Sequence, residues 1–304
     1  MRTRPAVTAR ILFALVAAAA LARPAAAQRA TVLPPDLEDP VAEHPDWVGD
    51  FAVASANAVL GALTAATTRW LHGGEFRAPF TDGFLGGLVG FAGKRVAVER
   101  APGAGFLGRE IAAIGASMVA NAGAGDALLD RVVLPVGPLW LTLERRDERG
   151  FHTDVHVDAA AVAAIGYAIA EDRLEFDGHG SVSAGTAVFR APGTLFERKW
   201  QDNVRSSGIA VGGTLWLSEI ERFGESYSER VFAHERIHVL QADFFAIAWG
   251  EPLQREIAAR SKLLSHADRA LRFGWGEVFL STLSLFGDHG SRPWEVEANF
   301  LENR

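Results

Sequence analysis

The residues whose types and spacing could do chemistry lie in one short stretch, His234-Glu235-Arg236-Ile237-His238. Residues four positions apart share a face of an α-helix, so the two imidazoles can bind a single metal ion. Glu235 would lie beside the open coordination position, where a carboxylate can take a proton from a metal-bound water. The pattern indicates metal-assisted hydrolysis if the stretch is helical and the chain supplies a third ligand.

The third ligand has to be an imidazole or a carboxylate, because the chain contains no cysteine. Phe244 occupies the position six residues after His238 and cannot bind a metal. Further on, residues 292–299 (RPWEVEAN) open a helix, and Ala298 leaves room there for close packing on the histidine helix. The candidate ligands are His266, Asp288, His289, Glu295 and Glu297.

Together with HERIH, the later E-x-x-A-N motif resembles the gluzincins, zinc peptidases with two histidine ligands on one helix and a glutamate on a following helix. The resemblance covers residues 208–304. It implies a Zn²⁺ cofactor bound by His234, His238 and Glu295, with Glu297 as the alternative third ligand. Asn299 stands where these enzymes often have Asp, and it would accept a hydrogen bond from a histidine ligand without adding a negative charge.

The resemblance also implies a mechanism, in which Glu235 is the general base for attack of zinc-activated water on a peptide bond. Gln241 lies on the same helical stripe and is expected to contact a ligand or the substrate. The stretch H-E-x-x-H-x-x-Q after a Gly-Gly strand resembles small exported bacterial peptidase-like domains. Gluzincins bind extended peptides along an edge strand, for which residues 214–218 are the expected counterpart. A donor that stabilises the oxyanion is also expected, and the candidates for it are His266, His289 and Tyr227.

Capping signals surround the two motifs and predict the helices that position them. The capping box Ser226-x-x-Glu229 predicts a helix that starts before the histidines, and Gly250-Glu251-Pro252 predicts its end. A second helix is expected over residues 252–271. The last helix is expected to begin near Pro293, because proline is favoured in the first turn.

Residues 46–131 read as helices interrupted by glycine, over residues 46–71, 82–100 and 107–122. Five glycines between positions 83 and 93 predict that helix backbones approach closely there. A membrane-associated and a tightly packed soluble hairpin both fit this pattern. The charged pairs Lys94-Arg95 and Arg109-Glu110 interrupt the apolar stretches and favour the soluble hairpin.

Residues 132–218 change to the alternating pattern of short strands, with a helix over residues 159–170 that Asp158 can cap. The chain as a whole is therefore expected to be α+β. It would consist of Gly-rich helical hairpins (46–131) followed by a zincin-like metallohydrolase region (132–304). That region divides into a short-strand sheet (132–218) and active-site helices (219–304).

The N-terminus has the composition of an export signal. Arginines precede the apolar residues 11–21, and Ala25-Ala26-Ala27 offers a cleavage site before Gln28. Residues 1–27 are predicted to be a signal peptide, and the Pro-rich, acidic residues 28–45 a flexible leader. The protein would then be periplasmic or extracellular. After cleavage, 26 Lys and Arg face 37 Asp and Glu, and this net charge of −11 argues against nucleic acid as a partner.

The sequence as a whole predicts an exported zinc-dependent metallohydrolase, in particular a peptidase acting on a peptide or protein substrate. The alternative is a non-catalytic, envelope-associated binding or structural protein with a structural or degenerate zinc site. A closed structural site would use four protein ligands, and the sequence offers three good ones, which favours an open, catalytic site.

Overall fold

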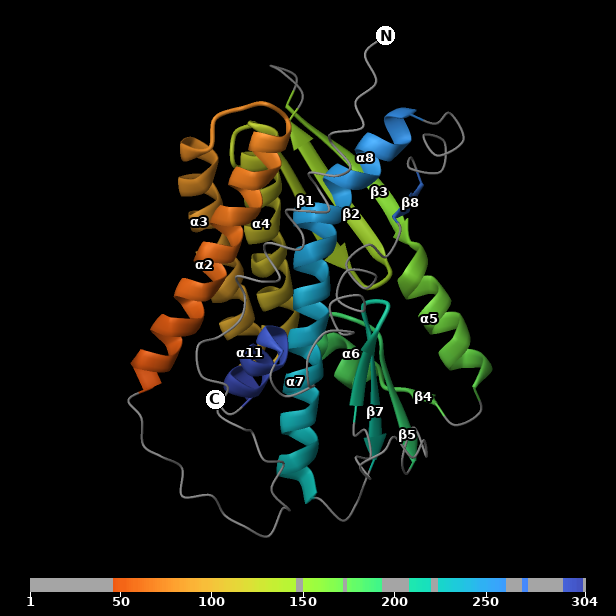
Figure 1. The fold of residues 1–304 in the computed structure, drawn as a ribbon. Coiled ribbons are helices and arrows are strands. Elements are labelled where there is room, and N and C mark those ends of the chain that lie inside the picture. Colours follow the sequence, from red (N-terminus) through yellow and green to blue (C-terminus); the bar gives the residue numbers. More distant parts are fainter. Residues whose placement is uncertain are drawn as a thin grey trace.

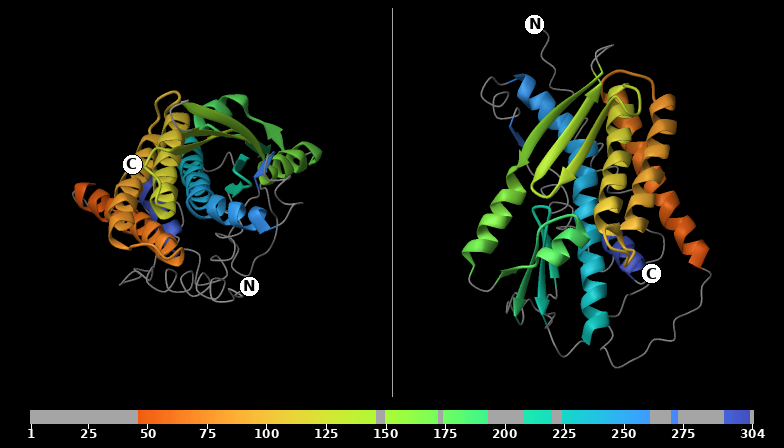
Figure 2. Two further views of the ribbon diagram at one scale, coloured as in Figure 1. Left: turned by 90° about the horizontal axis from the view of Figure 1, so that it is seen from above. Right: turned by 180° about the vertical axis from the view of Figure 1, so that it is seen from behind.

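The computed structural model describes residues 46–145, 150–171, 174–192, 208–219, 224–260, 270–272 and 292–302. Within them the chain is α+β, as predicted. The expected signal peptide and leader lie outside the described residues. Three N-terminal helices lie on one side of the long helix α7 (Gly224–Phe245), and two small sheets lie on the other side (Figures 1 and 2).

The N-terminal helices pack side by side with their backbones in close contact, as the glycines predicted. They are α2 (Asp46–Leu71), α3 (Arg77–Ala97) and α4 (Ala104–Ala124). A Cβ atom on Gly87 would overlap the carbonyl oxygen of Asn57 on α2, and one on Gly93 would overlap the backbone of α4. Helix α3 begins earlier than predicted, because Pro79 fits in its first turn.

One helix among the described residues, 49–71 within α2, is long and apolar enough to cross a membrane. The face that it turns toward α3 and α4 consists of small residues. Ala58, Ala62, Ala65 and Ala66 on this face are fully buried. Helix α2 therefore packs against α3 and α4 along one side.

The strands form two four-stranded sheets, whereas the sequence analysis expected one. The first sheet has the order β1-β2-β3-β8 and contains β1 (Arg131–Val136), β2 (Leu139–Arg145), β3 (Phe151–Asp158) and β8 (Leu271–Arg272). Asp158 ends β3 and caps α5 (Ala159–Ala170) by accepting hydrogen bonds from the backbone N–H groups of Ala160 and Ala161. This predicted helix leads the chain away from the first sheet, and a second sheet follows.

The second sheet has the order β4-β5-β7-β6, with the short helix α6 (Gly178–Ala184) inserted between β4 and β5. Its strands are β4 (Glu175–Phe176), β5 (Val188–Pro192), β6 (Gly208–Val211) and β7 (Thr214–Glu219). The expected edge strand, residues 214–218, is wrong, because β7 pairs with β5 on one side and β6 on the other. Gly212 and Gly213 both have positive φ, so the chain turns tightly and places β6 at the edge of the described sheet.

Helix α7 does not end at Gly250-Glu251-Pro252, so that prediction is wrong. It continues through a π-helical turn (Ala246–Gly250) into α8 (Glu251–Arg260). The backbone N–H of Glu251 donates to the carbonyl of Ala246, five residues back. This π-helical turn comes directly before Pro252, which has no backbone N–H to donate. Within the turn, the backbone hydrogen bonds reach five residues back instead of four.

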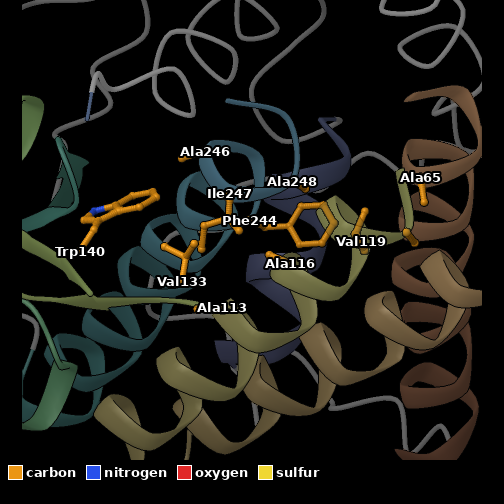
Figure 3. Close-up of a cluster of buried hydrophobic side chains, with 11 residues drawn as sticks. Ala65, Ala113, Ala116, Val119, Val133, Trp140, Phe244, Ala246, Ile247 and Ala248 are labelled. Carbon is orange, nitrogen blue, oxygen red and sulfur yellow. The ribbon is translucent and has the colours of Figure 1, made fainter. Parts of the chain in front are cut away.

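In the main core, α7 packs between the N-terminal helices and the first sheet (Figure 3). Phe244 and Ile247 come from the end of α7 and the π-helical turn, and they pack among Val119 of α4 and Trp140 of β2. At the middle of α7, the C-terminal helix α11 (Pro293–Glu302) packs on its side. Ile237 of α7 meets Ala298 and Leu301 of α11, and all three are fully buried.

Candidate metal centre

The packing of α11 on α7 brings together three of the predicted ligands, His234, His238 and Glu295. The Nε2 atoms of the two histidines lie 3.0 Å apart. Each of them lies 3.3 Å from Oε2 of Glu295. The Glu295 side chain is 8% exposed and the histidine side chains 16%, so the group lies near the surface but is largely shielded from water.

These separations fit one small divalent cation. Ligand atoms about 2.0–2.1 Å from a tetrahedral ion lie about 3.3 Å from one another. The observed 3.0 to 3.3 Å matches that spacing closely. The three atoms therefore converge on a common point, and the two imidazoles do so because they lie one helical turn apart.

The other nitrogen of each imidazole is bound by an acceptor that sets the orientation of the ring. Nδ1 of His238 lies 2.8 Å from Oε1 of Gln241, so Gln241 contacts a histidine of the group, in line with one of its expected roles. Nδ1 of His234 lies 2.7 Å from Oε2 of Glu302. The resemblance implied this role for Asn299, one turn earlier on α11. With Nδ1 occupied in both rings, Nε2 is the atom that faces the centre.

Glu297, the alternative third ligand, is not part of this group. Its carboxylate lies 2.8 Å from Nζ of Lys94 and also accepts hydrogen bonds from Gln241 and Asn57. Burial alone would raise the pKa of Glu297, but the charge and hydrogen bond of Lys94 outweigh it and hold the pKa below its ordinary value. The geometry thus favours Glu295 over Glu297 as the third ligand.

Glu235, the predicted base, is partly buried between the two histidines and strand β6. Burial raises the pKa of its carboxyl, while the nearby His238 and His234 oppose the shift. The backbone N–H of Ala210 on β6 donates to this carboxylate. A Cβ atom on Gly208 would lie 2.7 Å from Cγ of Glu235, so the strand can come this close only with glycine at that position. The strand beside the base is therefore β6.

The electrostatic environment of the two imidazoles favours positive charge. Burial lowers the pKa of His234, but hydrogen bonds to Glu295 and Glu302 outweigh it and raise the pKa to about 10. Burial likewise lowers the pKa of His238, and Glu295 and Glu235 reverse the effect, so that its pKa is raised. Three carboxylates around two imidazoles form a site that a divalent cation would neutralise.

His266, Asp288 and His289 lie outside the described residues, as does the side chain of Tyr227. Glu302 was not among the predicted residues, although its spacing from Glu295 is a signal for it. Glu302 follows Glu295 by seven residues, or two helical turns, so both carboxylates lie on one face of α11.

Comparison of the chain with protein-family models, curated proteins and solved structures finds no match.

Proposed function

We propose that this protein is an exported zinc-dependent metallohydrolase, specifically a peptidase. One observation carries the proposal. Three ligand atoms from His234, His238 and Glu295 lie 3.0 to 3.3 Å from one another, next to the carboxylate of Glu235. The signal-like residues 1–27 support a site of action in the periplasm or outside the cell.

The donor set favours zinc among the common divalent cations. Two imidazole nitrogens and one carboxylate oxygen are the ligands of many hydrolytic zinc sites, whereas magnesium and calcium prefer oxygen ligands only. With three protein ligands, one position remains for water or substrate. Zinc, when bound, would polarise the scissile carbonyl and activate water for attack.

The protein's own groups would bind the substrate and move the proton. Glu235 takes the proton of the attacking water and returns it to the leaving amine, a role that its raised pKa suits. Glu302 and Gln241 hold the imidazoles in orientation. Strand β6 lies at the edge of the described sheet beside Glu235, whose carboxylate accepts a hydrogen bond from the backbone N–H of Ala210, so this is the strand that an extended peptide would meet next to the base.

The test compares the wild-type protein with the Glu235→Gln variant. Elemental analysis should find about one zinc per chain in both proteins, because Glu235 is not a ligand. Hydrolysis of unfolded protein and peptide libraries should fall by about 10²- to 10⁴-fold in the variant, the usual contribution of a general base. Glu256→Gln is the matched control, since Glu256 is an exposed glutamate on α8 paired with Arg260.

Two results would count against the proposal. A folded wild-type protein that takes up no zinc would remove its basis. Zinc uptake without hydrolysis of any substrate would instead support the alternative, a non-catalytic, envelope-associated binding or structural protein.

A further inference from the structure

Lys94 is a buried cation in the apolar helix α3, and its ammonium group is fully bonded. It is 4% exposed. Its Nζ donates to Oε1 and Oε2 of Glu297, at 2.9 and 2.8 Å, and to Oδ1 of Asn57, at 2.9 Å. An ammonium group has three hydrogens, and these contacts use them all. The Lys94 ammonium group thereby keeps Glu297 as a charged hydrogen-bond acceptor beside helix α7.

Asn57 closes this cluster from helix α2. Its Nδ2 donates to Oε1 of Glu297, at 2.6 Å, and to the carbonyl of Val53, at 2.9 Å, while its oxygen accepts from Lys94. Helices α2 and α3 approach each other closely at Gly87, which lies directly over the backbone of Asn57. This close approach allows Asn57 to contact Lys94 and Glu297. Helices α2 and α3 thus fix the position of the Glu297 carboxylate.

Glu297 in turn determines which way round the amide of Gln241 lies. Nε2 of Gln241 donates to Oε2 of Glu297, at 2.8 Å, and to the carbonyl of Trp294, at 3.0 Å. A carboxylate and a carbonyl can only accept hydrogen bonds, so the NH₂ end of the amide has to face them. The amide oxygen is then the atom that lies 2.8 Å from Nδ1 of His238.

This orientation decides where His238 carries its proton. The amide oxygen only accepts, so Nδ1 of His238 must carry a hydrogen. In the neutral imidazole the lone pair then lies on Nε2. Nε2 is the atom that converges with His234 and Glu295, and a metal ligand needs its lone pair on that atom.

We propose that Lys94, acting through Glu297 and Gln241, is a positioning residue that fixes the tautomer and the ring orientation of His238 for metal binding. Helices α2 and α3 are then part of the metal site, although they contribute none of the three ligands. The proposal rests on the proposed function, because it assigns these residues to the same zinc site.

The main test removes both charges of the cluster in the variant Lys94→Met/Glu297→Gln. Both side chains keep their approximate shape, and no buried charge is left unpaired. The amide at position 297 can present either its oxygen or its nitrogen to Gln241, so the orientation of Gln241 is no longer enforced. Zinc affinity, measured by competition with a chelator, should fall about 10- to 100-fold, the usual effect of losing a group that orients a ligand.

The matched control is Arg109→Met/Asp243→Asn. This buried ion pair, with Nε and Oδ2 2.7 Å apart, also joins an N-terminal helix to α7. Neither residue has a hydrogen bond or ion pair with His234, His238 or Glu295 among the contacts of the described residues. Zinc affinity should stay within about twofold of wild type, even if the melting temperature falls.

Gln241→Leu provides a second variant and a test of coupling. It leaves the Lys94–Glu297 pair in place and should weaken zinc binding by itself, so the inference stays testable if the double variant does not fold. In the Gln241→Leu background, Lys94→Met/Glu297→Gln should have no further effect on zinc affinity. A merely structural role would lower the affinity equally in both backgrounds.

A spectroscopic readout reports on the proton itself. In zinc-loaded wild type, ¹H–¹⁵N spectra should show a protected Nδ1–H signal for His238, and this signal should weaken or shift in both variants. Wild-type zinc affinity in Gln241→Leu, or equal losses in the two backgrounds, would overturn this inference alone. A wild-type protein that binds no zinc would overturn it together with the proposed function.

Discussion

Oε2 of Glu302 lies 2.7 Å from Nδ1 of His234, two helical turns beyond Glu295 on the same helix. Helix α11 therefore places two carboxylates around one imidazole. Glu295 meets its Nε2 at the centre, and Glu302 holds its Nδ1 from behind. A carboxylate behind a metal-binding histidine fixes the ring and makes it a stronger ligand.

Replacing Glu302 with Gln should weaken zinc binding about 10- to 100-fold. The amide can still accept a hydrogen bond from Nδ1, but it carries no negative charge to strengthen the imidazole. A chelator competition at fixed pH measures the effect, with Glu256→Gln as an exposed control. Unchanged affinity would show that Glu302 does not support the ligand.

Replacing Glu295 with Gln should lower zinc affinity by more than about 100-fold, because it removes a ligand rather than a group behind one. A cruder version of this experiment would delete residues 295–304. That deletion also removes Ala298 and Leu301, which are fully buried against Ile237, so a loss of metal could reflect lost packing. Tight zinc binding by a folded Glu295→Gln protein would point to another ligand.

Two glycines of α3 should respond to alanine in opposite ways. A Cβ atom on Gly87 would overlap the backbone of Asn57, so Gly87→Ala should destabilise the protein by about 1–3 kcal/mol. At Gly90 the nearest contact of a Cβ atom is Cδ2 of Phe244, at 3.9 Å. Gly90→Ala should therefore be neutral or stabilising by up to about 1 kcal/mol, since alanine favours helix. Urea unfolding of both variants checks the difference.

Glu110 on α4 should make stability depend on pH. Both of its carboxylate oxygens are buried and have no hydrogen-bond partner among the described residues. Burial raises its pKa from 4.5 to about 7, although the neighbouring Arg109 opposes the shift. The folded protein therefore holds this proton more tightly than the unfolded chain does, and stability falls as the pH rises from 4.5 to about 7.

Glu110→Gln should remove that dependence. The variant should be more stable than wild type at pH 8 by on the order of 1–2 kcal/mol, after allowance for partial exposure of the group, and nearly equal at pH 4. Melting temperatures across this range, compared with those of the exposed control Glu256→Gln, measure the effect. A wild type with a flat profile would contradict the assigned pKa.

The sequence determined the local features of this protein. Helical periodicity placed His234 and His238 on one face, and the limits of α2, α5 and the start of α11 followed from apolar runs, caps and proline. The glycines of α3 correctly predicted close backbone contact. These features depend on neighbours a few residues apart, and the identity of those neighbours is enough to specify them.

The tertiary structure decided everything that depends on contact between distant segments. It brought Glu295 rather than Glu297 to the two histidines, placed Glu302 behind His234, and put β6 beside Glu235. It also joined Lys94 to Glu297, across more than two hundred residues of chain, and Glu297 to Gln241. Two glutamates two positions apart on one helix look alike in sequence. They differ in their contacts because one faces the histidines of α7 and the other faces a buried ammonium group of α3, and only the packing of the helices sets those partners.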